Sequence, residues 1–249
     1  MGRKRKKFRR HRGMRLFYKI LSVILALAAI LTGTVLFFQV EHIEVSGNEK
    51  YSAEQILTAA NVSEKANLIL LPQGRIQNDL LTSLPYLSSV KICRRFPTTL
   101  QIHLTESKPI SAIACDDTWC LLSEEGKILE QVDESLAQTY IEIIGLPLLT
   151  PTVGQLIQVA PEDIARRDSL TNLLAALADK DLLSKVSLID FSTPNEIKMN
   201  YDNRLTVDFL VGADFPRKLR ILLKASALID ENAIGTFDLR ADCAYFRAN

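Results

Sequence analysis

An unbroken run of 21 uncharged residues, 20–40, is the strongest constraint on what this chain of 249 residues can fold into. The run is rich in Leu, Ile, Val, Ala and Phe. At a rise of 1.5 Å per residue it forms a helix of about 31 Å, which matches the roughly 30 Å hydrocarbon core of a bilayer. A helix also pairs every backbone N–H inside the lipid. The run therefore predicts one transmembrane helix.

The charges on the two sides of this run differ strongly. Residues 1–19 hold ten Lys or Arg and no acidic residue, whereas the rest of the chain holds 20 basic and 29 acidic residues, a net charge of −9. A basic flank stays in the cytoplasm, so we expect residues 1–19 to be a cytoplasmic tail and the C-terminus to lie outside the membrane. Since a membrane span already accounts for the basic tail, no nucleic-acid partner is expected.

A cleaved signal peptide is the alternative interpretation of the same segment. Ala26, Leu27 and Ala28 have the small-x-small form of a cleavage site. Cleavage there leaves only six apolar residues before the site, fewer than a usual signal peptide has, and the apolar run continues to Phe38. We therefore predict a retained anchor.

All four cysteines, Cys93, Cys115, Cys120 and Cys243, lie in the predicted external part, where disulfides are permitted. Cys115 and Cys120 flank four residues and are spaced to face each other across a hairpin, at a distance that suits a disulfide. Four buried thiols are the equal alternative, and the sequence does not decide between them. The sequence has no C-x-x-C pair, so structural zinc is not expected.

Residues 41–109 are predicted to form a first domain with the order β-α-α-β-β. A strand over residues 40–45 precedes a helix that Ser52 and Gln55 cap, and residues 75–83 form a second helix. Two alternating runs around Ile92 and Ile102 then form strands that the turn 95–98 joins. We expect both helices to cover one face of a three-stranded sheet.

Residues 110–249 are predicted to form a β-rich domain with two helices, so that the whole chain is of the α+β class. The helices are expected over residues 161–180 and 216–230. The strands are expected over residues 119–122, 128–131, 140–144, 186–191, 196–201 and 205–210, with terminal strand material at 237–239 and 244–246.

No catalytic motif in the sequence is complete. Ser88 and Lys91 match the S-x-x-K pattern of penicillin-recognising enzymes, but the S-D-N and K-T-G partners of that pattern are missing. Cys93 with His42 or His103 is a conceivable nucleophile and base, yet a surface histidine on a small sheet is far commoner. We therefore predict that the chain is not an enzyme and uses no cofactor.

The motifs of the first domain resemble those of the bacterial cell-division family FtsQ, called DivIB in Gram-positive bacteria. The most specific stretch runs from Leu84 to Ile110 and includes an aromatic-Pro turn, Phe96-Pro97, and a Glu-x-x-Pro exit at Glu106. The opening strand, with Gly47 and Asn48 at its end, is similar as well. The resemblance implies a POTRA (polypeptide-transport-associated) domain at residues 41–109, followed by the β domain.

The same resemblance implies a non-enzymatic scaffold of the division machinery at the septum. Such proteins hold the membrane proteins FtsB (DivIC in Gram-positive bacteria) and FtsL, and a septal penicillin-binding protein is a further expected partner. A POTRA-containing translocation component and an anchored cell-wall enzyme are the alternative functions. The translocation component is disfavoured because about 140 residues after the POTRA domain cannot build a large barrel.

In the resembling family the partner adds beside the last strand, next to the last helix. Carried over to this sequence, the partner-binding residues are expected to be Phe237, Leu239, Arg240, Cys243, Ala244 and Tyr245, together with Leu222 and Leu223. The turn residues Arg94, Arg95 and Phe96 are a second surface that a partner is expected to contact. Because strand residues alternate, only some members of the first set should face outward.

Overall fold

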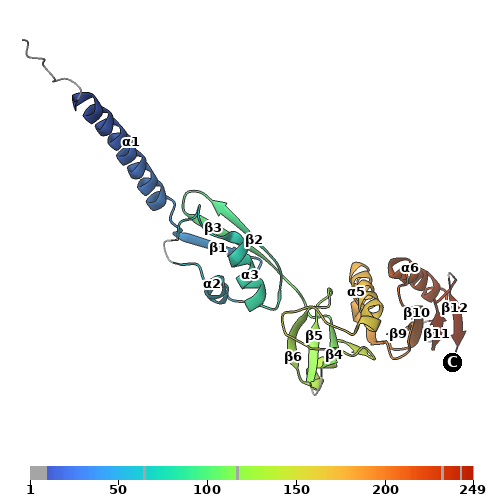
Figure 1. The fold of residues 1–249 in the computed structure, drawn as a ribbon. Helices are drawn as coiled ribbons and strands as arrows, with labels where there is room; N and C mark the ends of the chain where they lie inside the picture. Colours follow the sequence, from blue (N-terminus) through green and yellow to red (C-terminus); the bar gives the residue numbers. More distant parts are fainter. Residues whose placement is uncertain (1–9, 64–65, 116–117, 231–232, 242, 249) are drawn as a thin grey trace, which may run out of the picture. The chain divides into compact units, whose positions relative to one another are not determined.

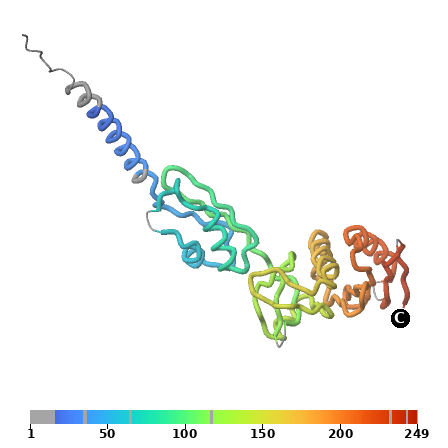
Figure 2. Tube along the Cα trace, viewed as in Figure 1, coloured from blue at the N-terminus to red at the C-terminus, as the bar shows by residue number. Residues whose placement is uncertain are grey.

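A computed structural model describes residues 10–63, 66–115, 118–230, 233–241 and 243–248 of the chain (Figure 1). The chain divides into two compact units. One unit combines Met1–Asp79 with Val90–Leu104, and the other combines Leu80–Ser89 with Thr105–Asn249. Figure 2 follows the chain from one unit to the other along the Cα trace.

Helix α1 spans Arg10–Phe37 and contains the apolar window Phe17–Thr34, none of which is buried. Among the described residues it is the one helix long and apolar enough to cross a membrane. It begins ten residues earlier than the predicted residue 20, since Arg and Lys are good helix formers and the tail holds no proline. It ends before the predicted residue 40, because the N–H of Val40 bonds to the carbonyl of Ala66 instead (2.9 Å).

A three-stranded sheet with two helices follows α1, in the predicted order. The elements are β1 (His42–Ser46), α2 (Ala53–Ala60), α3 (Gln73–Ser83), β2 (Leu87–Arg95) and β3 (Thr99–Glu106). The sheet order is β1-β3-β2, with β1 parallel to β3. The capping box that Ser52 and Gln55 predicted is present at the start of α2.

The core of this unit follows from the alternation along β3. Leu100 and Ile102 are fully buried, whereas His103 on the other face is exposed. Ile56 of α2 and Ile76 of α3 are also buried. The apolar stripe of each helix is therefore covered by the apolar face of the strands.

Among its described residues, the second unit contains one sheet of nine strands in the order β12-β11-β10-β9-β8-β7-β4-β5-β6. Their bounds are β4 (Ser111–Cys115), β5 (Thr118–Leu122), β6 (Ile128–Val132), β7 (Ile141–Ile144), β8 (Val186–Asp190), β9 (Glu196–Tyr201), β10 (Leu205–Leu210), β11 (Gly235–Asp238) and β12 (Tyr245–Ala248). Parallel pairing of β7 with both β4 and β8 joins the two halves of the sheet. Gly145 ends β7 at a φ of +77°, where a Cβ would lie 2.2 Å from the backbone nitrogen of Ser192.

The helices of this unit are α4 (Glu134–Ala137), α5 (Ile164–Asp179) and α6 (Phe215–Ser226), with short 3-10 turns at Pro161–Asp163 and Leu183–Lys185. Leu170, Leu173, Leu174 and Leu177 of α5 are buried in the main core together with Leu219 and Leu222 of α6. The predicted α+β class is confirmed. The predicted helix 216–230 is too long, since α6 ends at Ser226 and Leu228 is 87% exposed.

Candidate partner-binding surface

The surface predicted from the sequence centres on β12, which forms one edge of the nine-stranded sheet. Strand β12 pairs antiparallel with β11, with Phe237 opposite Phe246 and Asp238 opposite Tyr245. No other strand among the described residues pairs with β12. Its outer backbone groups therefore face away from the sheet, and alternate residues present an N–H and a C=O there.

The opposite edge of the same sheet is less open. The N–H of Ile128, at the start of β6, donates to the carbonyl of Gln155 (2.9 Å), and the Ile128 carbonyl accepts from the N–H of Gly154 (2.8 Å). The backbone of Lys127 forms a further, isolated antiparallel β-bridge with that of Leu156. The loop of residues 154–156 thus pairs with one end of β6, which leaves β12 as the more accessible edge.

Three of the predicted partner-binding residues face the core. Phe237 and Leu239 on the β11 side and Leu222 of α6 are each at most 1% exposed. The ring of Phe246 packs on the ring of Phe237, with the centroids 4.9 Å apart. These side chains hold the edge strand against the core, and they are not at its surface.

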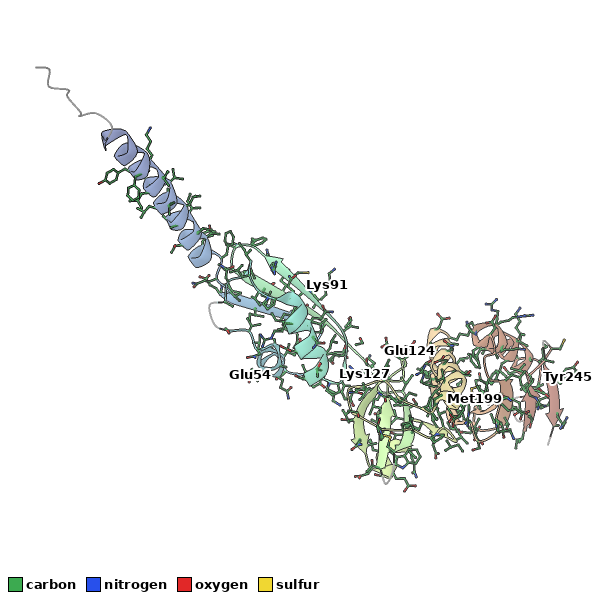
Figure 3. The ribbon with its side chains drawn as sticks, viewed as in Figure 1. Glu54, Lys91, Glu124, Lys127, Met199 and Tyr245 are labelled. Atoms are coloured by element: carbon green, nitrogen blue, oxygen red, sulfur yellow. A yellow bond between two sulfur atoms is a disulfide. The ribbon has the colours of Figure 1, made fainter. Side chains whose placement is uncertain are left out.

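The other residues of the set are accessible to different degrees. Tyr245 is 64% exposed and lies on β12 at the edge of the sheet (Figure 3). Arg240 and Cys243 are exposed, and Leu223 and Ala244 are partly buried against the core. Because Phe246 turns inward, its neighbour Tyr245 lies on the other face of the sheet.

Arg240 is held by two carboxylates on that face. Its guanidinium donates to Asp238 at 2.6 Å and to Glu196 at 2.7 Å. The hydrogen bond from Arg240 lowers the pKa of Asp238 to about 2. The next strand places Asp208 opposite Asp238, where burial raises the pKa of the Asp208 carboxyl. The surface beside the edge strand is therefore polar and largely paired within itself.

Lys218 was not predicted from the sequence as a residue of this region. It lies on the buried face of α6 and is 8% exposed. Its Nζ donates to the carbonyl of Ala241 at 2.5 Å, so it ties α6 to the connection between β11 and β12. A lysine among the inward positions of an amphipathic helix is the sequence signal that could have revealed it.

The second predicted surface, the turn between β2 and β3, is only partly free. Arg94 is partly buried, and its guanidinium donates to the carbonyl of Leu71 at 2.7 Å. Arg95 is exposed. Phe96 is 59% exposed, with its ring centroid 5.6 Å from that of Phe38. Arg94 therefore has a structural contact, whereas Arg95 and Phe96 are available to a partner.

The residues considered for catalysis lie on β1, β2 and β3 of the three-stranded sheet. Lys91 is exposed, and its side chain extends from β2 (Figure 3), while the hydroxyl of Ser88 donates to the carbonyl of Thr105 (3.0 Å). The Nδ1 of His103 is 2.7 Å from the Oγ of Ser46, and His42 lies opposite Thr99. The two histidines therefore lie at opposite ends of the β1–β3 pairing. Among the described residues, no group of three or more His, Cys, Asp or Glu side chains is placed to hold a metal.

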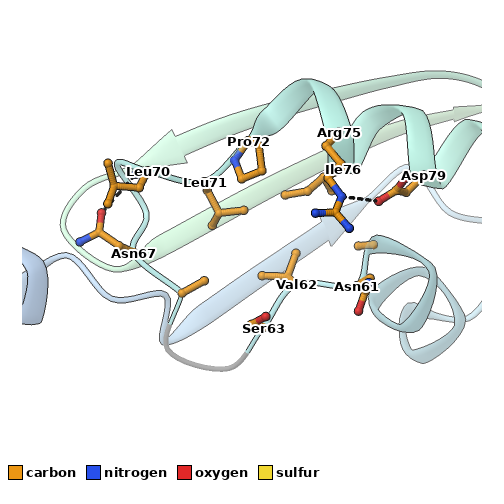
Figure 4. Close-up of a pocket in the computed structure, with 12 residues that line it drawn as sticks. Asn61, Val62, Ser63, Asn67, Leu70, Leu71, Pro72, Arg75, Ile76 and Asp79 are labelled. Atoms are coloured by element: carbon orange, nitrogen blue, oxygen red, sulfur yellow. Dashed lines mark hydrogen bonds and ion pairs between the residues drawn. The ribbon is translucent and has the colours of Figure 1, made fainter.

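A recess of about 340 Å³ lies at the connection between α2 and α3 (Figure 4). Its lining is mixed: Val62, Leu71 and Ile76 are apolar, and Arg75 pairs with Asp79 at 3.6 Å.

Cys115 and Cys120 are joined by a disulfide across the β4–β5 hairpin, with the Cα atoms 5.9 Å apart. This is one of the two states that the sequence left open. Cys93 and Cys243 are free thiols, the first partly buried and the second exposed.

Comparisons with known proteins fit this architecture. Residues 38–107 match the family model of the POTRA domain of the FtsQ type. The cell division protein DivIB of Clostridium tetani is 23% identical over 178 residues, which cover 72% of this chain and 65% of that protein. DivIB of Clostridium acetobutylicum is 24% identical over 171 residues, covering 69% and 67%. FtsQ of Corynebacterium glutamicum is 28% identical over 162 residues and 64% of each chain.

The chain thus spans about two thirds of the length of these relatives. A solved structure of the major extracytoplasmic domain of the trans isomer of DivIB from Geobacillus stearothermophilus aligns with a TM-score of 0.33 at 17% identity, over 51% of this chain and 98% of that one. The resemblance predicted from the sequence is confirmed: residues 38–107 match an FtsQ-type POTRA domain, and the chain is similar to the DivIB and FtsQ cell division proteins.

Proposed function

We propose that this chain is a non-enzymatic scaffold of the cell-division machinery. It holds FtsB/DivIC-type and FtsL-type membrane partners, contacts a septal penicillin-binding protein, and so helps coordinate septal peptidoglycan synthesis with constriction. Support comes from the FtsQ-type POTRA domain and from relatives that are named cell division proteins.

The proposed topology has one span and two external domains. Residues 1–19 lie in the cytoplasm, the apolar part of α1 crosses the membrane, and residues 41–109 and 110–249 form the POTRA and β domains outside, at the division septum. The basic tail and the single apolar helix of the described chain support this orientation.

The open edge of β12 is the observation that carries the proposal. An extended partner segment adds to such an edge by completing the unpaired backbone groups, and exposed side chains beside it give specificity. Tyr245 is a suitable anchor because a large, rigid aromatic ring with a polar hydroxyl is frequent among interface hot spots.

Apolar surface near one end of this edge extends the proposed site. Ile234 is 60% exposed and directly precedes Gly235, which pairs with Ala248 of β12. A large apolar side chain in water next to an open strand favours a partner that contributes both a strand and an apolar face. We propose that five of the residues predicted from the sequence contact this partner: Arg240, Cys243, Ala244, Tyr245 and Leu223.

The test is co-purification of the full chain with DivIC-type and FtsL-type partners in detergent or nanodiscs. Tyr245→Lys removes the aromatic anchor and should weaken partner binding by about tenfold or more. The matched control is Gln131→Lys, which adds a lysine at an exposed position of β6, the opposite edge strand. It should leave the affinity unchanged.

A melting curve of each variant separates lost binding from lost folding, since both positions are exposed. Equal affinities for Tyr245→Lys and the unmodified chain would rule out the β12 edge as the binding site. Absence of any binding by the unmodified chain would contradict the scaffold function itself.

A further inference from the structure

Large apolar side chains are exposed where the chain leaves helix α1. Phe37 is 64% exposed, Phe96 59%, Ile69 40% and Leu70 74%. Together with the exposed Arg95 these four residues are named the exit patch. Isolated exposed apolar residues are ordinary, but four on neighbouring segments need a physical reason.

The members of the exit patch are brought together by contacts around Phe38. The ring centroid of Phe38 is 5.2 Å from that of Phe37 and 5.6 Å from that of Phe96. The carbonyl of Phe38 accepts a hydrogen bond from the N–H of Leu68 at 2.7 Å, immediately before Ile69. The patch is therefore continuous with the end of the apolar helix.

The loop that carries Ile69 and Leu70 is held so that the two side chains point away from the core. Its flanking residues Leu68 and Leu71 are buried, at 0% and 6% exposure. The Oδ1 of Asn67 accepts from the N–H groups of Ile69 (2.9 Å) and Leu70 (3.2 Å). Figure 4 shows Leu70 and Leu71 directed to different sides of this loop.

Arg94 fastens this loop to the sheet. Its guanidinium bonds to the carbonyl of Leu71 (2.7 Å), which brings the loop to the end of β2 where Arg95 and Phe96 follow. A flexible loop would fold its apolar residues inward, whereas this one is fixed by Asn67, by Arg94 and by the bond to Phe38. The exposure of Leu70 is thus built into the structure.

The charges around the patch suit a membrane surface. Arg95 places a cation next to Phe96, and long basic side chains keep their head groups in the polar layer while their stems lie against apolar groups. Glu41 is exposed as well, and it lies near the patch because its N–H bonds to the carbonyl of Thr98 in the turn that follows Phe96. Aromatic and basic residues at the end of a span are typical of the headgroup region.

We propose that the exit patch inserts into the headgroup layer of the same membrane that α1 spans, on the side of the external domains, so that lipid covers Leu70 and Phe96. The POTRA sheet is then held at the membrane surface by two points, the end of α1 and this patch. The inference rests on the proposed membrane span, and it is independent of the identity of any protein partner.

Lipid-quenched tryptophan fluorescence of the full chain in vesicles tests the proposal. Trp119 is the only tryptophan, so Trp119→Phe provides a silent background. Leu70→Trp and Phe96→Trp then report on the patch in vesicles of phosphatidylcholine and phosphatidylglycerol that carry bromine near the headgroup. Glu49→Trp is the matched control. Glu49 is exposed and lies beyond the far end of β1, a strand about 13 Å long that begins near the exit patch.

Shallow bromines should quench the tryptophans at positions 70 and 96 about twofold more than the one at position 49, as expected for rings at headgroup depth. Adding Phe96→Ser to the Leu70→Trp variant should reduce the quenching at position 70, because both side chains insert together. Equal quenching at the three positions would overturn the proposal. Quenching at position 70 or 96 that disappears when a protein partner is added would assign the patch to that partner, which also overturns it.

A tryptophan within the helix separates failure of the patch from failure of the span. Leu25→Trp lies in the apolar window, and bromines near the chain ends should quench it strongly. If the tryptophan at position 25 is quenched and the patch tryptophans are not, the span holds and only the patch proposal fails. If the helix tryptophan is not quenched either, the span itself is wrong.

Discussion

At the scale of single residues, two aspartates on neighbouring strands have opposite electrostatic environments. Arg240 hydrogen-bonds to Asp238 and lowers its pKa to about 2, so this carboxylate stabilises the fold. Burial raises the pKa of Asp208, which lies opposite it in the register, so the charged form of Asp208 disfavours the fold. The two pKa shifts differ in direction because of where the side chains lie. Asp238 reaches the guanidinium of Arg240, whereas the Oδ1 of Asp208 is buried with no hydrogen-bond partner among the described residues.

The two aspartates should therefore respond to mutation with opposite signs. Asp238→Asn removes a stabilising charge, and we expect the melting temperature at pH 7 to fall by roughly 1–3 °C. The depressed pKa means that this stabilisation is complete above the unfolded value of about 3.9 and is lost as the pH falls through about 2. The difference between Asp238→Asn and the unmodified chain should thus shrink to a small remainder by pH 2.

Asp208→Asn is the matched comparison, because it is the same chemical change on the next strand. A raised pKa costs stability at neutral pH, and this cost disappears as the pH falls below the unfolded value. Asp208→Asn should therefore raise the melting temperature at pH 7, and the gain should shrink below about pH 4. Thermal melts from pH 2 to 7 measure both effects, and a loss of stability by both variants at pH 7 would refute the assignment.

At the scale of elements, the sequence predicts those strands whose alternation is bounded by turn residues. Strands β9 and β10 have the predicted bounds, because apolar residues alternate on both sides of the turn at Asp202 and Asn203. Both turn residues have positive φ, which Asp and Asn tolerate better than most residues. Here local chemistry and the final fold agree.

Other elements depend on distant contacts, so the sequence does not reveal them. The strand β4 was not predicted with bounds of its own, and α4 is a single turn that covers Ala112 and Leu121. The nine described strands form one sheet because β7 pairs in parallel with both β4 and β8. Helix α5 lies between β7 and β8 in the sequence. Long-range pairing of this kind leaves no local pattern.

The partner-binding set shows the same limit. Alternation along β11 and β12 predicts that some members face inward, but it does not identify the face that α6 covers. The structure places Phe237, Leu239 and Leu222 in the core and leaves Tyr245 exposed. Contact with a partner stays a prediction, and it now concerns only the accessible residues of the set: Arg240, Cys243, Ala244, Tyr245 and Leu223.

The disulfide of the β4–β5 hairpin provides the prediction at this scale. Cys115 and Cys120 close a short loop, and restricting the unfolded chain in this way contributes about 2 kcal/mol to the free energy of unfolding. Reductant should therefore lower the denaturation midpoint of the unmodified chain, and Cys115→Ala with Cys120→Ala should have the low midpoint without reductant. Denaturant titrations monitored by Trp119 fluorescence measure this, because Trp119 lies in the hairpin.

A variant with Cys93→Ala and Cys243→Ala is the control, since these two thiols are free. It should respond to reductant as the unmodified chain does. If thiol counting shows reduction of the pair while the midpoint does not move, the disulfide contributes nothing to stability.

At the scale of the whole molecule, the uneven charge and the single apolar helix of the described chain lead to one orientation. Ten basic residues precede residue 20, and all 29 acidic residues follow residue 40. The basic tail opposes translocation, whereas a net charge of −9 after the span does not. On the proposed topology, the open β12 edge, the exit patch and the disulfide share the compartment outside the cytoplasm, where an oxidising environment preserves a disulfide.

Thiol accessibility in intact cells tests this orientation. Cys243 is exposed and free, so a membrane-impermeant maleimide should label it from outside. A variant with His11→Cys, Cys93→Ala and Cys243→Ala moves the one free thiol to the basic tail, and it should be labelled only after the membrane is permeabilised. Labelling of the tail cysteine in intact cells would reverse the topology. In that case neither the β12 edge nor the exit patch would lie outside the cytoplasm, because both locations are inferred from the positive-inside rule.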